Sequence, residues 1–191
     1  MQKRFFGLLL LLPVFVFSQG KLVKSKPQFQ SSAGISLAAG QFEPSYQWQI
    51  VNGFKLNNWF AGVGAGMDYY RYRTVPVFLS VRRDRLFNRS FFAFADAGAT
   101  LPFLKDEQKQ EFAVQDKFYT GFYSETGVGY AIPSKRKFSL RFSAGYSFRT
   151  MKERLETASF SSYWPSPNTI TEYNYKFHLI TLRAAVAFTS K

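Results

Sequence analysis

The chain has 191 residues, no cysteine, 19% aromatic residues and a formal net charge of +13 at pH 7. This length suits one domain, and the lack of cysteine excludes disulfides, thiolate metal sites, a cysteine nucleophile and the lipid-bearing cysteine of a bacterial lipoprotein. Beyond residue 20 no apolar run reaches the roughly 18 residues of a membrane-spanning helix, so a helical membrane protein is excluded as well.

The N-terminal segment has the three parts of a secretory signal peptide. Residues 3–4 are basic, residues 5–17 are apolar, and residues 18–20 are small or polar, as in a cleavage region. The apolar run is too short to span a membrane as a helix, and it contains a proline. We therefore predict a signal peptide at residues 1–19 and a single domain at residues 20–191.

The rest of the chain contains eight segments in which apolar residues alternate with small or polar ones, less strictly in the first, second and last, a pattern typical of β-strands. In chain order they are residues 31–40, 46–54, 59–70, 75–82, 91–101, 118–132, 138–149 and 176–188. In the third segment Gly62, Gly64 and Gly66 fall on the same face as Asp68. Because these glycines alternate within one strand, they do not form a phosphate-binding loop, which needs a strand, then glycines, then a helix.

The composition of the two strand faces indicates which face points inward. A soluble barrel carries long, solvated Lys and Glu on its outside, whereas the polar faces here consist of Gly, Ser, Tyr and isolated charges. Such small residues fit the narrow interior of an eight-stranded barrel, and the apolar faces then contact lipid. The sequence thus predicts an all-β fold, an eight-stranded antiparallel transmembrane β-barrel with up-and-down meander topology, located in the cell outer membrane.

The connections between the segments predict an orientation. Those at residues 55–58, 83–90 and 133–137 are short, whereas those at residues 102–117 and from Thr150 to Tyr175 are long. Outer-membrane barrels have short periplasmic turns and longer extracellular loops, so we expect the long connections outside the cell and the Thr150 to Tyr175 loop to be the main exposed binding candidate. Aromatic girdles at the lipid headgroups are expected from residues near the strand ends, namely Tyr46, Trp48, Trp59, Tyr69, Tyr130, Tyr146 and Phe188.

Charged residues on the inward faces form the first candidate site. Isolated charges in a confined interior are costly unless they are paired. The predicted lumen ion-pair residues are Asp68, Asp96, Glu125, Arg141 and Arg183, with Arg82 and Arg149 on the same inward faces. We expect these residues to close the lumen. The alternative is a narrow solute channel, which conductance measurements would detect.

Basic residues gather in the segments assigned to the periplasmic end. The predicted basic periplasmic rim comprises Arg82, Arg83, Arg85, Arg89, Lys135, Arg136 and Lys137. We expect it to contact phosphates of outer-membrane lipid and lipopolysaccharide, with docking of a periplasmic protein or peptidoglycan as the alternative. Nucleic acid is not an expected partner, because an exported barrel does not meet it and a high net charge alone is nonspecific.

His178 is the only histidine and shares a face with Ile180 and Leu182, which are expected to face lipid. Lipid A deacylases of the outer membrane place a histidine and a nearby serine on such a surface, so an outer-leaflet lipid-modifying enzyme is the alternative function. Here Ile180 breaks the His-x-Ser spacing, and general-base catalysis needs a nucleophile or water within reach. We predict no catalytic residue, no metal site and no cofactor.

Three stretches of the chain carry a resemblance to a known family. They are VNGFKLNNWFAGVGAGMDYY from Val51, VPVFLSVRRDRL from Val75 and FFAFADAGA from Phe91. Together with FSQ at residues 17–19, they resemble the small outer-membrane β-barrel proteins of Bacteroidota, which implies a fold and a location but no uniform activity. The last strand, ending at Phe188, is similar to the terminal signature by which barrel-assembly machinery recognises its clients. We expect a non-enzymatic barrel with a structural, adhesion or assembly role.

Overall fold

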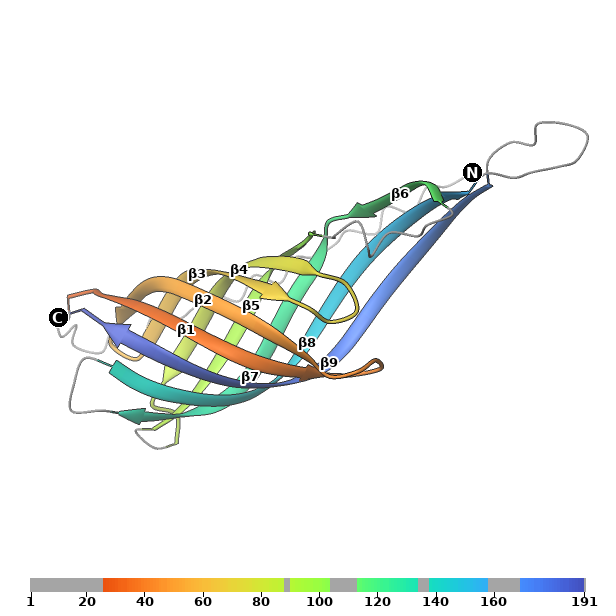
Figure 1. Cartoon of the computed structure of the whole chain (residues 1–191). Coiled ribbons are helices and arrows are strands. Elements are labelled where there is room, and N and C mark those ends of the chain that lie inside the picture. Colours follow the sequence, from red (N-terminus) through yellow and green to blue (C-terminus); the bar gives the residue numbers. More distant parts are fainter. Residues whose placement is uncertain (1–25, 88–89, 104–112, 134–137, 158–168, 191) are drawn as a thin grey trace, which may run out of the picture.

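The computed structural model describes residues 26–87, 90–103, 113–133, 138–157 and 169–190 (Figure 1). The predicted signal peptide lies outside these residues. The described part consists of β-strands only, and none of it is a helix that could cross a membrane. The strands are β1 (Gln28–Ala39), β2 (Ser45–Leu56), β3 (Trp59–Asp68), β4 (Thr74–Asp84), β5 (Phe91–Pro102), β6 (Ala113–Tyr119), β7 (Gly121–Pro133), β8 (Phe138–Thr157) and β9 (Thr169–Thr189).

The strands form one antiparallel sheet that closes on itself. Strands β1 to β5 each pair with the next, β5 pairs with β7, β7 with β8, β8 with β9, and β9 with β1. Strands β6 and β7 occupy the same position in the barrel, since β6 pairs with residues 152–157 of β8 and β7 pairs with residues 139–149. The barrel therefore has eight strand positions in meander order, which confirms the predicted fold.

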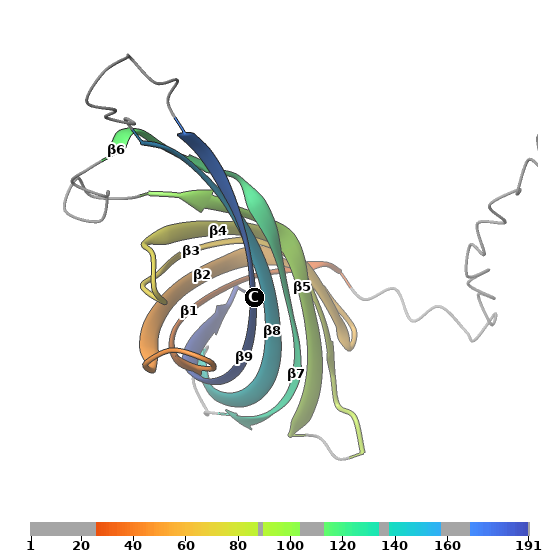
Figure 2. The same ribbon diagram turned by 90° about the vertical axis from the view of Figure 1, so that its right-hand side faces the viewer.

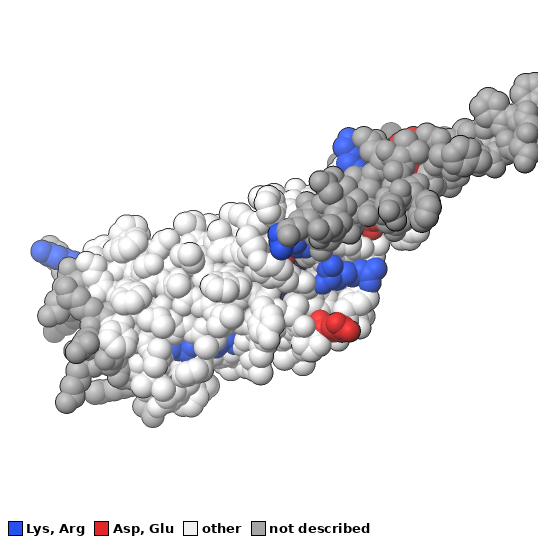
Figure 3. Space-filling model, viewed as in Figure 1, with Lys and Arg blue, Asp and Glu red and all other residues white. Residues whose placement is uncertain are grey.

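The two faces of each strand differ in the way that the alternation predicted. In β2, Gln47 and Gln49 are 0% and 3% exposed, whereas Tyr46, Trp48 and Ile50 are 56–60% exposed. The predicted girdle residues are all exposed as well. Over the face shown in Figure 3, the barrel wall has almost no charged side chains. The barrel thus buries a polar face and exposes an apolar one, the reverse of a soluble protein.

Inward glycines leave room for inward aromatic rings. A Cβ atom on Gly64 would lie 2.4 Å from the ring of Phe78, and one on Gly129 would lie 2.3 Å from the ring of Phe92. A narrow barrel lets a large side chain point inward only where a neighbouring strand has a small residue. The glycine alternation read from the sequence therefore fills the lumen with aromatic rings rather than leaving it open.

The two ends of the barrel differ in their connections. At the turn end, where β1 begins and β9 ends, β2 and β3 are joined by Asn57 and Asn58 alone. Asn57 has a positive φ of 54°, which asparagine tolerates better than most residues. At the opposite loop end, β8 and β9 continue beyond the barrel as a long hairpin with β6 beside β8 (Figures 1 and 2).

This hairpin corrects two of the predicted loops. Residues 150–157 and 169–175 are paired strand rather than loop, and part of the predicted loop at residues 102–117 belongs to β6. We call residues 150–157 and 169–175, together with β6, the extension. Buried and exposed residues still alternate in the extension: Met151, Glu153 and Leu155 are buried, while Lys152 is exposed. The alternation is hard to see in the sequence, because charged residues occur on both faces. Residues 158–168 lie outside the described part.

A bulge divides the predicted strand at residues 118–132 and reverses its faces. Tyr119 is opposite Lys152 of β8, whereas Tyr123 is opposite Arg149, so the β6–β7 side has one extra residue in between. One extra residue exchanges the inward and outward sets. Phe118, which alternation placed outward, therefore contacts the ring of Tyr72, while Tyr119 is 42% exposed.

Candidate functional site

In the middle of the lumen, Arg183 of β9 binds two carboxylates from other strands. Asp96 of β5 and Glu125 of β7 are directly opposite in register. Arg183 Nη2 lies 2.6 Å from Glu125 Oε1, and its Nη1 lies 3.6 Å from Asp96 Oδ2. Tyr123 Oη and Thr181 Oγ1 each donate a hydrogen bond of 2.8 Å to Glu125. The carboxylate of Glu125 is thus fully buried and surrounded by donors.

Toward the loop end, Arg149 of β8 forms an ion pair with Asp68 of β3. In the strand order these two strands lie on opposite walls of the barrel. Arg149 Nη2 also donates to Gln47 Oε1 at 2.9 Å, and its Nε donates to Ser147 Oγ at 3.1 Å. This ion pair therefore crosses the lumen from wall to wall.

Toward the turn end, Asp84 of β4 is shared by three cationic side chains. It forms an ion pair with Lys55, accepts a 3.1 Å hydrogen bond from Arg82 Nε, and lies 4.0 Å from Arg141 Nη2. Arg82 Nη2 also donates to Gln30 Oε1. A single carboxylate thus partners three positive charges from β2, β4 and β8.

The lumen arginines also lie over aromatic rings, an arrangement that favours a desolvated guanidinium. The distances from the guanidinium carbon to the ring centre run from 4.3 to 5.8 Å. The pairs are Arg82 with Phe60, Arg183 with Phe94, Arg149 with Tyr123 and Arg141 with Phe92. Each of these four arginines therefore has an aromatic ring beside its polar partners.

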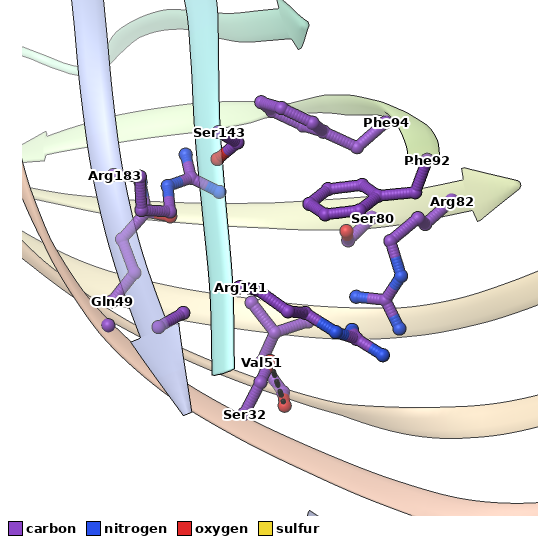
Figure 4. A pocket seen from close by; sticks show the side chains of 12 residues that line it. Ser32, Gln49, Val51, Ser80, Arg82, Phe92, Phe94, Arg141, Ser143 and Arg183 are labelled. Carbon is purple, nitrogen blue, oxygen red and sulfur yellow. Dashed lines mark hydrogen bonds between the residues drawn. The ribbon is translucent and has the colours of Figure 1, made fainter. Parts of the chain in front are cut away.

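A small cavity remains between the middle and turn-end charges, with a volume of about 40 Å³ (Figure 4). Its walls include Arg82, Arg141 and Arg183 together with the rings of Phe92 and Phe94. A buried water needs roughly 10–15 Å³ of such space, so the cavity holds about three waters or one small ion.

The structure divides the predicted lumen residues among these three charge groups. It brings Asp96, Glu125 and Arg183 together, while Asp68 pairs with Arg149 and Arg141 lies near Asp84. Sequence reasoning missed Lys55 and Asp84, both assigned to periplasmic turns. Asp84 has the same parity as Ser80 and Arg82, so extending the β4 pattern by two residues would have placed it inside.

The predicted basic rim is only partly described. Arg83 points outward with its guanidinium 5.3 Å from the ring of Trp59, and Arg85 is exposed at the turn end. Arg82 lies inside the lumen and is 7% exposed, because it shares the inward parity of β4, so it does not belong to an outer rim. Arg89, Lys135, Arg136 and Lys137 lie outside the described residues.

His178 lies on the outer face of β9 near the loop end. Tyr146 forms a hydrogen bond with its Nδ1, and the ring of Phe148 lies 5.1 Å away. Its side-chain partners among the described residues are thus the aromatic residues Tyr146 and Phe148. Within the described residues no cluster of His, Asp or Glu is suited to hold a metal ion.

An aromatic cluster, formed by Tyr70, Tyr72, Phe118, Tyr175 and Phe177, covers the inner side of the extension. The guanidinium of Arg71 lies over the rings of Tyr72 and Tyr175. Tyr175 donates a 2.6 Å hydrogen bond to Glu153 Oε2. Burial and that bond raise the pKa of Tyr175 above its ordinary value.

Comparison with known proteins places the chain in a class by its fold. No protein-family model matches the sequence, and no curated protein matches it. The outer membrane protein OprG of Pseudomonas aeruginosa is similar in structure, with a TM-score of 0.52, 9% identity, and 86% of this chain and 95% of that chain covered. The chain thus has the fold of an outer-membrane β-barrel.

Two further solved structures are similar over comparable lengths. Neisserial surface protein A has a TM-score of 0.46 and 16% identity, covering 86% of this chain and 97% of its own. A de novo designed transmembrane β-barrel has a TM-score of 0.45 and 11% identity, covering 87% of this chain and 98% of its own.

Proposed function

We propose that this chain is a non-enzymatic protein of the bacterial outer membrane, with a lumen closed by ion pairs and a structural, adhesion or assembly role carried by its two ends. The observation that carries the proposal is the group formed by Arg183, Glu125 and Asp96, whose side chains are 13%, 0% and 1% exposed. Because these groups partner one another inside the barrel, they block the path that a solute would take.

Conductance in planar bilayers tests the closed lumen. We expect the refolded chain to show rare or no openings at low voltage. The variant Arg183→Gln leaves Glu125 and Asp96 without their cation and is expected to open more often, since the middle of the lumen then loses its bridge. Frequent openings of the unmodified chain at low voltage would support the narrow channel instead.

The apolar outer face supports a location in the outer membrane. Leu79, Ile180 and Val63 are 60–66% exposed in the middle of their strands, a composition that suits lipid and not water. Fractionation of a Gram-negative host should recover the chain with the outer membrane. The resemblance to barrels of Bacteroidota belongs to this proposal as well and makes the barrel-assembly machinery the expected partner in insertion.

The basic turn end is proposed to contact lipid phosphates, with a periplasmic protein or peptidoglycan as further partners. Arg83 points outward there and suits a photo-crosslinking side chain, because the described structure gives it a single ring contact. Crosslinks to lipid alone would argue against a protein or glycan partner. Crosslinks to protein or glycan would support the docking role.

The lack of enzymatic activity is proposed from the surroundings of His178, whose partners Tyr146 and Phe148 include no serine of the kind that lipid A deacylases place beside their histidine. Reconstituted membranes containing lipid A should show no hydrolysis by the chain. Hydrolysis that disappears in His178→Ala would replace this proposal with a lipid-modifying enzyme.

A further inference from the structure

The charges at the turn end of the lumen do not balance. Lys55, Arg82 and Arg141 share the carboxylate of Asp84, which leaves two positive charges in excess in this part of the barrel. The middle group has the opposite excess, because Arg183 alone faces both Asp96 and Glu125, so the two groups together keep one positive charge in excess. Positive charge in a confined interior is costly unless an anion compensates it.

Arg141 is the least compensated of these three cations. The residue is 7% exposed, and its contact with Asp84 is 4.0 Å long, beyond hydrogen-bond distance. Its Nε and Nη1 are buried and have no hydrogen-bond partner among the described residues. A guanidinium presents its donors in one plane, which suits an oxyanion, and the donors on Nε and Nη1 of Arg141 have no acceptor in the described part of the chain.

These donors line the cavity described above. Figure 4 shows that Arg141 of β8 and Arg82 of β4 extend into the same region from different walls, below the ring of Phe92. Ser143 adds a hydroxyl group to the lining. Lys55, which shares Asp84 with these arginines, has a side chain that is 25% exposed at the turn end.

We propose that this cavity binds a small inorganic oxyanion, such as phosphate or sulfate, between Arg141 and Arg82. Its size excludes nucleotides and lipid headgroups with their attached chains, since about 40 Å³ holds about three waters or one small ion. The bound anion satisfies Arg141 and neutralises the repulsion between two buried arginines. This site is distinct from the proposed role of the protein, because binding requires neither conduction nor a partner.

Binding of radiolabelled inorganic phosphate to the refolded chain in detergent, measured by equilibrium dialysis at constant ionic strength, tests the proposal. We expect saturable binding at one site per chain, competed by sulfate and not by a bulky organic sulfonate. Arg141→Gln should weaken it at least tenfold. Lys26→Gln, an exposed cation at the same end, should leave it unchanged and thereby excludes a general effect of net charge.

Ser143→Leu provides a second variant that keeps every charge and fills the cavity, for the case that Arg141→Gln does not fold. It should weaken phosphate binding by a similar factor. Absence of saturable binding by the unmodified chain, or equal binding by Arg141→Gln, overturns the site. Conductance of the same samples is measured separately, so that failure of the closed lumen and failure of the anion site can be told apart.

Discussion

Each inward charge of this barrel is stabilised by the side chains that it contacts. Which side chains these are depends on the position of the charge along the barrel axis. Alternation places Asp68, Asp96 and Glu125 on inward faces, but it does not tell which arginine each one meets. That is decided by the stagger between strands, which relates residues distant in sequence. Arg149 and Asp68, on opposite walls, are therefore a pair that only the closed structure reveals.

Glu125→Gln should destabilise the barrel by about 2–4 kcal/mol, less than the 3–5 kcal/mol typical for loss of a whole buried partner. Tyr123 and Thr181 donate to different oxygens of Glu125, so the amide oxygen keeps only one of these two hydrogen bonds, and Arg183 loses its nearest charge. Urea unfolding of the barrel in lipid vesicles measures the change.

Two comparisons make that measurement specific. Glu172→Gln, an exposed carboxylate opposite Arg154 in the extension, should change stability by less than about 0.5 kcal/mol. The double variant Glu125→Gln with Arg183→Gln should lose less than the sum of the two single variants, because their effects are coupled. Additive losses would mean that the ion pair contributes nothing of its own.

Gly64→Ala should destabilise the barrel by about 1–3 kcal/mol, the usual range for an overpacked interior. The new methyl group would lie 2.4 Å from the ring of Phe78. Adding Phe78→Leu should restore part of the loss, because leucine lacks the ring atoms that clash. Ala65→Val, which adds volume to the outer face of the same strand, should have little effect on the same unfolding curve.

The bounds of strands with one buried and one exposed face could be predicted from the alternation of apolar and polar residues. The predicted bounds of β5 at residues 91–101 differ from the observed Phe91–Pro102 by one residue. The extension could not be predicted in the same way, since Lys152, Arg154 and Glu156 place charge on one face of a sheet that lies beyond the apolar belt. The bulge before Gly121 leaves no signal in alternation, because Tyr and Phe suit either face.

Deletion of Thr120 tests the bulge. Removing the extra residue leaves Phe118 two positions from Gly121, so regular alternation should place Phe118 inward and Tyr119 outward without a bulge. Phe118 thus keeps Tyr72, and β6 should remain paired with β8 as a direct continuation of β7. Limited trypsin digestion should cleave after Lys117 no faster than in the unmodified chain.

Thr120→Ala is the matched control for this deletion, since it keeps the residue count and should be cleaved at the original rate. Faster cleavage after Lys117 in the deletion variant than in the control would show that β6 needs the bulge to stay paired with β8. Faster cleavage within the barrel strands would instead mean that the bulge supports the whole sheet.

The whole molecule combines an apolar belt with two unlike ends. The turn end has tight connections and a cationic interior, and the loop end extends into a paired sheet with the aromatic cluster on its inner side. In outer-membrane barrels the short turns face the periplasm and the longer connections lie outside the cell. The proposed orientation therefore places the turn end in the periplasm and the extension outside the cell.

Cysteine labelling in intact cells of a Gram-negative host tests this orientation, because the chain has no cysteine of its own. Asn174→Cys lies in the exposed part of the extension, and Asn58→Cys lies in the β2–β3 turn. A maleimide too large to cross the outer membrane should label Asn174→Cys in intact cells and Asn58→Cys only after the cells are broken. Labelling of Asn58→Cys alone in intact cells would reverse the proposed orientation, and the basic turn end could then no longer contact periplasmic partners.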